Sequence, residues 1–240
     1  MRHVALSLRR AAAMRWRVPM RWRVPMRWRV PMRWRVPMRW CVPTRWRVLL
    51  CALLLALGGL AGCKGGDEGF MLTDITGAPF GRDFQLTDHN GKPRRLADFR
   101  GKLVVLFFGY THCPDVCPTT LAELAGAMQQ LGADAGRVQV LFVTVDPERD
   151  TPALLAQYVP AFNPSFLGLY GDADATARTA KEFKIFYRKQ PGRTPDGYTM
   201  DHSAGSYVFD REGRLRLLMP YGQKVEALVH DLRLLLAAPG

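Results

Sequence analysis

Residues 103–118 read LVVLFFGYTHCPDVCP and combine an uninterrupted apolar run with a short turn that carries two cysteines. The apolar run, residues 103–110, is typical of a strand that is buried on both faces of a sheet. Pro118 suits the first turn of a helix, which the apolar pattern extends to about Leu131. This stretch therefore predicts a central strand, a turn and a helix, with both thiols at the junction.

The two cysteines of this junction, Cys113 and Cys117, are spaced i, i+4 in the chain. At the start of a helix this spacing brings both sulfur atoms to one face. The helix dipole and the free backbone N–H groups there favour thiolate over thiol. Thiolates in such a position bind soft metals or exchange disulfides, so this pair is the first candidate site.

Basic residues are concentrated near the N-terminus. The chain contains 34 Lys and Arg and 21 Asp and Glu, and residues 1–62 contain 14 of the arginines, no lysine and no acidic residue. The 20 basic residues that remain in residues 63–240 stand against all 21 acidic ones, which gives that part a formal net charge of −1. Nucleic-acid binding needs a basic face on the folded part, so we expect no nucleic-acid partner.

A short repeat fills most of the leader. Four copies of MRWRVP span residues 14–37, and a fifth begins at Met38 with Cys41 in place of an arginine. A six-residue repeat is too short for a solenoid unit, and the proline in each copy blocks a continuous helix. We expect residues 1–47 to form a disordered basic leader or to lie upstream of the true start. A basic membrane-surface arm with Trp side chains is the alternative.

Residues 48–63 have the pattern of an export signal. A basic stretch at 44–47 precedes an apolar run that is shorter than the ~20 residues of a membrane span, and the run ends in LAGC at 60–63. These four residues resemble the lipobox of bacterial lipoproteins, which implies that Cys63 carries the lipid. An uncleaved anchor is the alternative. Either way we expect a periplasmic or extracytoplasmic domain, tethered to a membrane through a linker at 64–78.

The predicted export determines which cysteines remain in the folded part. Of the five, Cys41 and Cys51 lie in the leader and Cys63 would carry lipid, so the folded part keeps one pair, Cys113 and Cys117. An exported domain with one closely spaced pair is held together by its core and not by a disulfide framework. The pair is therefore left free for chemistry.

Strands and helices alternate along the rest of the chain. The Asn90-Gly91 turn signal predicts an N-terminal β-hairpin, and the helix at 151–158 is expected to begin at a Thr151 cap. With a cysteine turn after the first central strand, this order predicts an α/β, thioredoxin-like fold at 79–238, with a central mixed β-sheet flanked by helices. The remaining expected elements are strands at 84–88, 138–145, 166–170, 203–210 and 215–219, and helices at 172–183 and 223–236.

Three ordered blocks of this domain resemble the Sco/SenC family of copper-binding, thioredoxin-fold proteins that assemble cytochrome c oxidase. They are GYTHCPDVCP at 109–118, VDPERDTP at 145–152 and YTMDHS at 198–203. The resemblance implies metal binding by Cys113, Cys117 and His202. It also requires the fold to bring a histidine from late in the chain to the start of the first helix.

The chemistry of these three side chains is compatible with copper. Two thiolates suit Cu(I), and an imidazole also suits Cu(II), so the set can hold either oxidation state. A structural zinc site would usually take a fourth ligand, and the sequence offers no evident one. His112 is a possible extra ligand that we expect to face outward, while Met200 and Met219 are soft donors that are more typical of a core.

Two further segments are less specific. Asp146 follows a buried strand and is a candidate to lie near the metal, where it would orient His202 or meet a partner. The alternative is that it belongs to a solvated capping loop. Residues 188–193, RKQPGR, are typical of a basic surface loop, and docking of a partner is the functional hypothesis for it.

The sequence leaves three functions open. The first is a copper chaperone that delivers copper to the dinuclear copper site of a cytochrome c oxidase subunit, with other periplasmic copper carriers or thiol reductases as further partners. The second is a thiol–disulfide oxidoreductase in which Cys113 and Cys117 form a catalytic, redox-active disulfide and reduce the acceptor's cysteine pair. The third is a redox sensor. Whether the protein is an enzyme depends on which of these holds.

Overall fold

The computed structural model describes residues 69–192 and 197–238. The predicted leader at 1–47 and the predicted signal at 48–63, with the lipidation site Cys63, lie outside the described residues. Within the described ranges no helix has both the length and the apolar character needed to cross a membrane.

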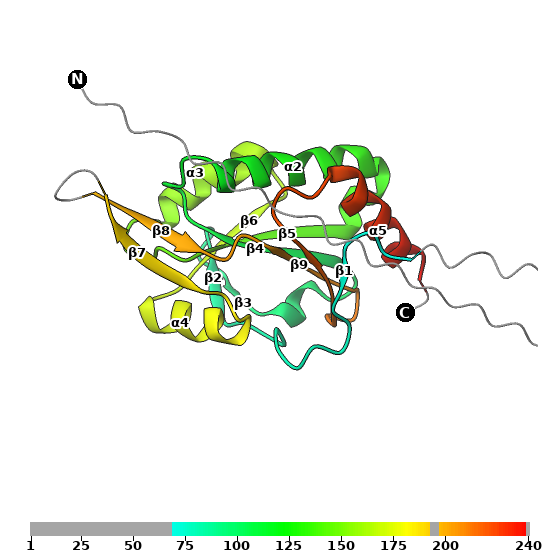
Figure 1. Cartoon of the computed structure of the whole chain (residues 1–240), viewed down its shortest axis with the longest axis horizontal. Helices are drawn as coiled ribbons and strands as arrows, with labels where there is room; N and C mark the ends of the chain where they lie inside the picture. Colours follow the sequence, from blue (N-terminus) through cyan, green and yellow to red (C-terminus); the bar gives the residue numbers. More distant parts are fainter. Residues whose placement is uncertain (1–68, 193–196, 239–240) are drawn as a thin grey trace, which may run out of the picture. The chain divides into compact units, whose positions relative to one another are not determined.

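The centre of the fold is an eight-stranded mixed sheet, which confirms the predicted fold class (Figure 1). Its three inner strands β4, β5 and β6 run parallel, and β9 lies antiparallel on the other side of β4. The strand order is β1 (Thr73–Asp74), β10 (Leu215–Met219), β9 (Ser206–Phe209), β4 (Leu103–Gly109), β5 (Val138–Thr144), β6 (Leu167–Tyr170), β2 (Leu86–Asp88) and β3 (Pro93–Arg94). Strands β2 and β3 form the hairpin that the Asn-Gly turn predicts.

Helices cover both faces of the sheet. The helices α2 (Val116–Leu131), α3 (Pro152–Phe162) and α5 (Val225–Ala237) lie on one side, and α4 (Ala173–Glu182) lies on the other (Figure 1). Short 3-10 turns, η1 (Leu96–Phe99) and η2 (Gly132–Arg137), connect strands and helices. The predicted cap of α3 is present, since the Thr151 hydroxyl accepts the Leu154 N–H at 3.2 Å.

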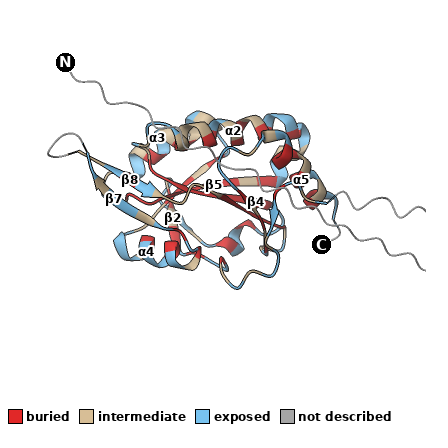
Figure 2. Cartoon of the chain, viewed as in Figure 1, coloured by how far each residue is buried: buried red, intermediate tan, exposed pale blue. Residues whose placement is uncertain are grey.

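The core explains why the apolar run of β4 is continuous. All seven residues of β4 are buried, and buried residues concentrate along the central strands (Figure 2). Successive side chains of a strand point to opposite faces. Accordingly, Phe107 packs against Phe142 at 6.0 Å between ring centroids, whereas Phe108 packs against Phe183, just beyond α4, at 5.4 Å. Both faces of this strand are therefore covered.

The folded part begins earlier than the sequence predicts. We expect a linker at 64–78, but Leu72 is buried and β1 pairs with β10. The buried carboxylate of Asp231, on α5, accepts the backbone N–H groups of Met71 and Leu72 at 2.9 and 2.8 Å. A strand of two residues has too little apolar pattern to be recognised, so the sequence places the domain boundary too late.

A second difference concerns the basic segment at 188–193. Instead of a loop, most of it forms strand β7 (Tyr187–Pro191), which pairs with β8 (Tyr198–His202) in a separate two-stranded sheet. In Figure 1 this hairpin extends away from the main sheet. No residue of β7 is buried, so it lacks the alternation by which a strand is recognised.

We expect Asp231→Ala to lower the free energy of unfolding by about 1–3 kcal/mol, because the buried N–H of Leu72 and the partly buried N–H of Met71 lose their acceptor. Urea unfolding of the metal-free, reduced domain measures this. Glu226→Gln, an exposed change on the same helix, is expected to stay within about 0.5 kcal/mol of wild type. Equal stability of the two variants would contradict the role of Asp231.

Candidate metal centre

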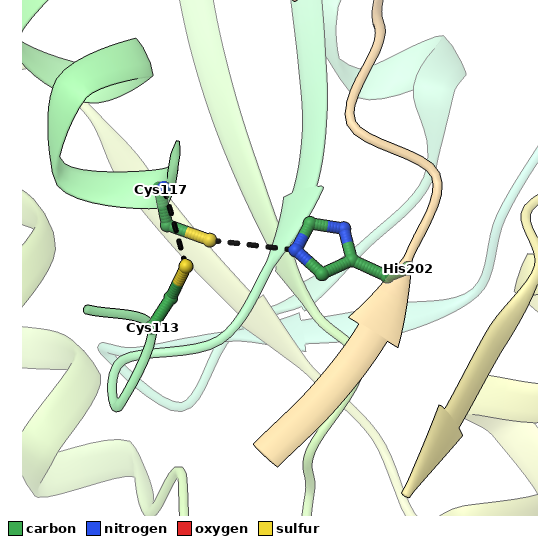
Figure 3. Close-up of side chains that lie close together, drawn as sticks. All are labelled: Cys113, Cys117 and His202. Carbon is green, nitrogen blue, oxygen red and sulfur yellow. Dashed lines mark hydrogen bonds between the residues drawn. The ribbon is translucent and has the colours of Figure 1, made fainter. Parts of the chain in front are cut away.

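Cys113, Cys117 and His202 meet in space (Figure 3). Cys113 lies in the turn after β4, Cys117 in the first turn of α2, and His202 at the end of β8. One ligand atom from each lies within 4.8 Å of the other two, and the Cys117 sulfur is 3.5 Å from Nε2 of His202. The structure therefore brings together residues that are 85 positions apart, as the candidate site requires.

The two thiols differ in environment. The Cys113 sulfur is partly exposed and accepts the backbone N–H of Cys117 at 3.4 Å, whereas Cys117 is fully buried. Burial raises the pKa of the Cys117 thiol well above its ordinary value. For Cys117 the expected preference for thiolate is therefore wrong in the metal-free protein, because desolvation outweighs the effect of the helix start.

The imidazole of His202 is oriented by the backbone. Its Nδ1 lies 2.9 Å from the carbonyl oxygen of Ser203, which can only accept, so Nδ1 carries the proton and Nε2 presents its lone pair to Cys117. The ring also packs edge-on against Tyr110, with centroids 5.8 Å apart. Burial lowers the pKa of His202, so the side chain is neutral at pH 7 and ready to bind a metal.

Gly109 makes room for the Cys117 sulfur. A Cβ at this position would lie 2.9 Å from that sulfur and 2.8 Å from the ring of Phe142. The last residue of β4 therefore has to lack a side chain if the helix start is to pack onto the sheet. Sequence reasoning did not single out this glycine, although it lies directly before the cysteine turn.

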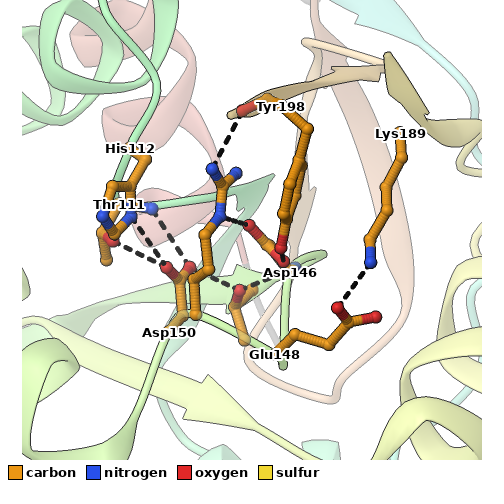
Figure 4. Close-up of polar contacts among 9 residues, drawn as sticks. Thr111, His112, Asp146, Glu148, Asp150, Lys189 and Tyr198 are labelled. Carbon is orange, nitrogen blue, oxygen red and sulfur yellow. Dashed lines mark hydrogen bonds and ion pairs between the residues drawn. The ribbon is translucent and has the colours of Figure 1, made fainter. Parts of the chain in front are cut away.

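Asp150 fixes the start of the cysteine turn, and it too was missed. Its buried carboxylate accepts the Thr111 N–H at 3.0 Å, the Thr111 hydroxyl at 2.6 Å and the Thr144 hydroxyl at 2.6 Å (Figure 4). Thr144 ends β5, so Asp150 joins the turn to the neighbouring strand. The available signal was a second aspartate in the block at 145–152.

Of the roles left open for Asp146, direct orientation of the His202 ring is not seen in the structure. Asp146 does not contact His202, whose Nδ1 is taken by Ser203. Instead the Asp146 carboxylate accepts the Tyr198 hydroxyl at 2.7 Å and Nε of Arg149 at 2.5 Å. Burial and this hydrogen bond raise the pKa of Tyr198 to about 12, which keeps the hydroxyl protonated as a donor. Asp146 thus holds the hairpin that carries His202.

The other candidate residues lie outside the ligand group. The side chain of His112 is 51% exposed and contacts the Thr111 hydroxyl. Met200 and Met219 are buried in the core, as expected. Within 69–192 and 197–238 the only His, Cys, Asp and Glu cluster that could hold a metal is the set of two cysteines and one histidine. Two sulfurs and one nitrogen suit a soft metal such as copper and leave a side open for ligand exchange.

The fold and the site together define a class: a thioredoxin-like domain whose dithiol turn is met by a histidine from a separate hairpin. The family comparison agrees with this description. The chain belongs to the SCO1/SenC family, whose model matches residues 73–237.

Solved structures and a curated sequence relative are similar to this chain. Bradyrhizobium japonicum ScoI with copper bound is 42% identical, with a TM-score of 0.60 and coverage of 64% of this chain and 98% of that chain. Apo Sco1 from Thermus thermophilus is 44% identical, with a TM-score of 0.63 and coverage of 71% and 99%. The mitochondrial SCO2 homologue of Bos taurus is 41% identical over 158 residues, which are 65% of this chain and 59% of that protein. The match therefore spans about three fifths of this curated relative.

We expect Gly109→Ala to destabilise the protein by about 1–3 kcal/mol, because the added methyl group overpacks the space beside Cys117. Gly126→Ala is the matched control: it lies in α2 with nothing within 4 Å of the new Cβ. A helical Gly-to-Ala change there raises stability by up to about 1 kcal/mol. Urea unfolding of both variants measures the difference, and effects of the same sign would overturn this interpretation.

Proposed function

We propose that this protein binds one copper ion through Cys113, Cys117 and His202 and delivers it to the dinuclear copper site of a cytochrome c oxidase subunit. The observation that carries the proposal is the convergence of the three ligand atoms within 4.8 Å of one another. Copper-bound structures of two relatives, from Bradyrhizobium japonicum and yeast, support the choice of metal.

The donor set explains how one site serves either oxidation state of copper. Two thiolates satisfy Cu(I), and the neutral imidazole supplies the harder donor that Cu(II) favours. Metal binding needs deprotonated sulfur, so copper displaces the proton that the buried Cys117 holds in the metal-free protein.

Transfer proceeds by ligand exchange. Cys113 is the more exposed thiol, so an acceptor thiolate approaches copper on that side. A bond from copper to the acceptor sulfur forms as a bond to one sulfur of this protein breaks, and the freed thiolate takes up a proton. No electron is transferred in this exchange, so copper leaves in the oxidation state in which it was bound.

The proposed setting is a membrane surface outside the cytoplasm. The apolar run and LAGC sequence at 48–63 support export and a lipid anchor on Cys63. The linker would keep the domain close to a membrane-bound acceptor and to periplasmic copper carriers or thiol reductases. N-terminal sequencing and mass spectrometry of the mature protein test this part, which fails if the processed chain does not begin with a lipid-modified Cys63.

The asymmetry of the two thiols favours a second candidate, thiol–disulfide exchange. The partly exposed Cys113 attacks the acceptor's disulfide as a thiolate and releases one acceptor thiol, and Cys117 then attacks the mixed disulfide. The acceptor pair is reduced to two thiols, while Cys113 and Cys117 are oxidised to a disulfide. One site can carry out both reactions in turn when a thiol reductase returns the Cys113–Cys117 disulfide to two thiols between them.

We expect His202→Ala to weaken Cu(II) binding by at least about a hundredfold, which exceeds the typical cost of removing an outer-shell partner. The same variant should fail to support oxidase assembly and keep its dithiol reactivity, because both sulfurs remain. Competition titration and a dithiol alkylation assay measure the two properties.

His112→Ala is the control for this experiment, since it removes the exposed neighbouring histidine and leaves the ligand set intact. If His202→Ala supports normal oxidase assembly, the copper-delivery proposal is contradicted and disulfide exchange is left as the function.

We expect copper binding to strengthen as the pH rises from 6 to 8. Burial raises the pKa of Cys117, so its thiol is protonated across this range and must release a proton, whereas His202, whose pKa is lowered, is neutral from about pH 7. Calorimetry in two buffers of different ionisation enthalpy should detect at least one proton released per copper. The result would be contradicted if wild type and Cys117→Ser released equal numbers of protons.

A further inference from the structure

The hairpin that carries His202 is not part of the main sheet. Strands β7 and β8 pair only with each other among the described strands, so the backbone hydrogen bonds of the eight-stranded sheet do not fix its position. A ligand on such an element needs other contacts to hold it against the sulfurs.

Besides the burial of Met200, polar contacts from the loop after β5 hold the hairpin. The Tyr198 hydroxyl donates to the buried Asp146 carboxylate at 2.7 Å, and Nη1 of Arg149 donates to the Tyr198 carbonyl at 2.9 Å (Figure 4). The Arg149 guanidinium also lies over the Tyr198 ring, 3.5 Å from its centroid. We call Asp146, Arg149 and Tyr198 the hairpin clamp.

The register of β8 links the position of Tyr198 to that of His202. Tyr198 and His202 are four residues apart in a strand, so their side chains share one face about 13 Å apart along the chain. Met200 between them is buried, while Thr199 and Asp201 are exposed, which confirms that this face is turned inward. Because a one-residue slip would turn His202 outward, fixing Tyr198 fixes the direction of the imidazole.

A second route runs through aromatic rings. The Arg149 guanidinium lies 5.7 Å from the centroid of Tyr110, and the Tyr110 ring packs at 88° against the ring of His202. Arg149 therefore lies over the rings of both Tyr198 and Tyr110, and Tyr110 in turn packs against His202.

The clamp is not explained by stability alone. Within the part of the chain that the structure describes, Nη2 of Arg149 is buried without a hydrogen-bond partner, which is a cost. Polar groups of this kind are retained in some proteins because they specify one arrangement. We propose that Tyr198 and Arg149 are positioning residues that hold His202 against the two sulfurs before the metal arrives. This inference rests on the proposed copper function.

The first test needs no metal. Both variants are studied in the metal-free protein. Tyr198→Phe keeps the ring and removes the hydroxyl, whereas Arg149→Lys keeps the positive charge and removes the planar guanidinium group. Both should speed backbone amide hydrogen exchange across residues 198–202 by at least about tenfold while the rate in β4 stays unchanged. Gln190→Ala is the matched control, because its 2.6 Å hydrogen bond to Asp201 lies on the outer side of the same hairpin. Amide exchange rates equal to those of wild type in both clamp variants would overturn the proposal.

The second test uses copper alone. Both clamp variants should bind Cu(II) about 10- to 100-fold more weakly, as for loss of an outer-shell partner, and change Cu(I) affinity less than threefold because the sulfurs remain. X-ray absorption should show less nitrogen per copper, and added imidazole should restore Cu(II) affinity in the variants and in His202→Ala but not change wild type. Unchanged nitrogen ligation in both variants would overturn the positioning role. Wild type that binds no copper would instead overturn the proposed function.

Discussion

Burial of β4 between two neighbouring strands and under both layers of helices is the constraint on which the candidate metal centre depends. Its parallel partner β5 ends beside it, where the Val145 N–H donates to the Gly109 carbonyl at 2.8 Å. Its antiparallel partner β9 places Ser206 opposite Phe107. The chain must therefore enter β9 at the end where β4 leaves the sheet, and a histidine four residues before Ser206 arrives beside the cysteine turn.

Much of this arrangement is predictable because it depends on burial. The apolar runs of β4 and β5, the Thr151 cap and the turns of the hairpins are local signals, and the structure confirms each of them. The ligand set is different. His202 is 85 residues from Cys117, and periodicity carries no information about such a contact. Only the three ordered blocks of family resemblance indicated it, and the register of β9 on β4 supplies the physical reason.

The features that the sequence did not predict share a lack of local apolar pattern. Strand β7 has no buried residue, and β1 is two residues long, so neither has the alternation of a half-buried strand. The two aspartates of the 145–152 block cannot be told apart by residue type. Asp150 turns toward the cysteine turn and Asp146 toward the hairpin, a difference that depends on the path of the backbone between them.

The two cysteines and the histidine of the candidate site lie on parts of the fold that differ in how firmly they are held. Cys117 lies in the first turn of α2 and Cys113 in the turn that joins β4 to α2, whereas His202 lies on a hairpin outside the main sheet. The buried Met200 and polar contacts to the loop after β5 hold this hairpin. Burial of Cys117 makes a proton compete with copper, which weakens binding relative to a dithiol in water. For the proposed copper carrier, this competition would favour release of the metal to an acceptor. Because the candidate ligand His202 lies outside the main sheet, the proposed coordination could open while the core stays intact.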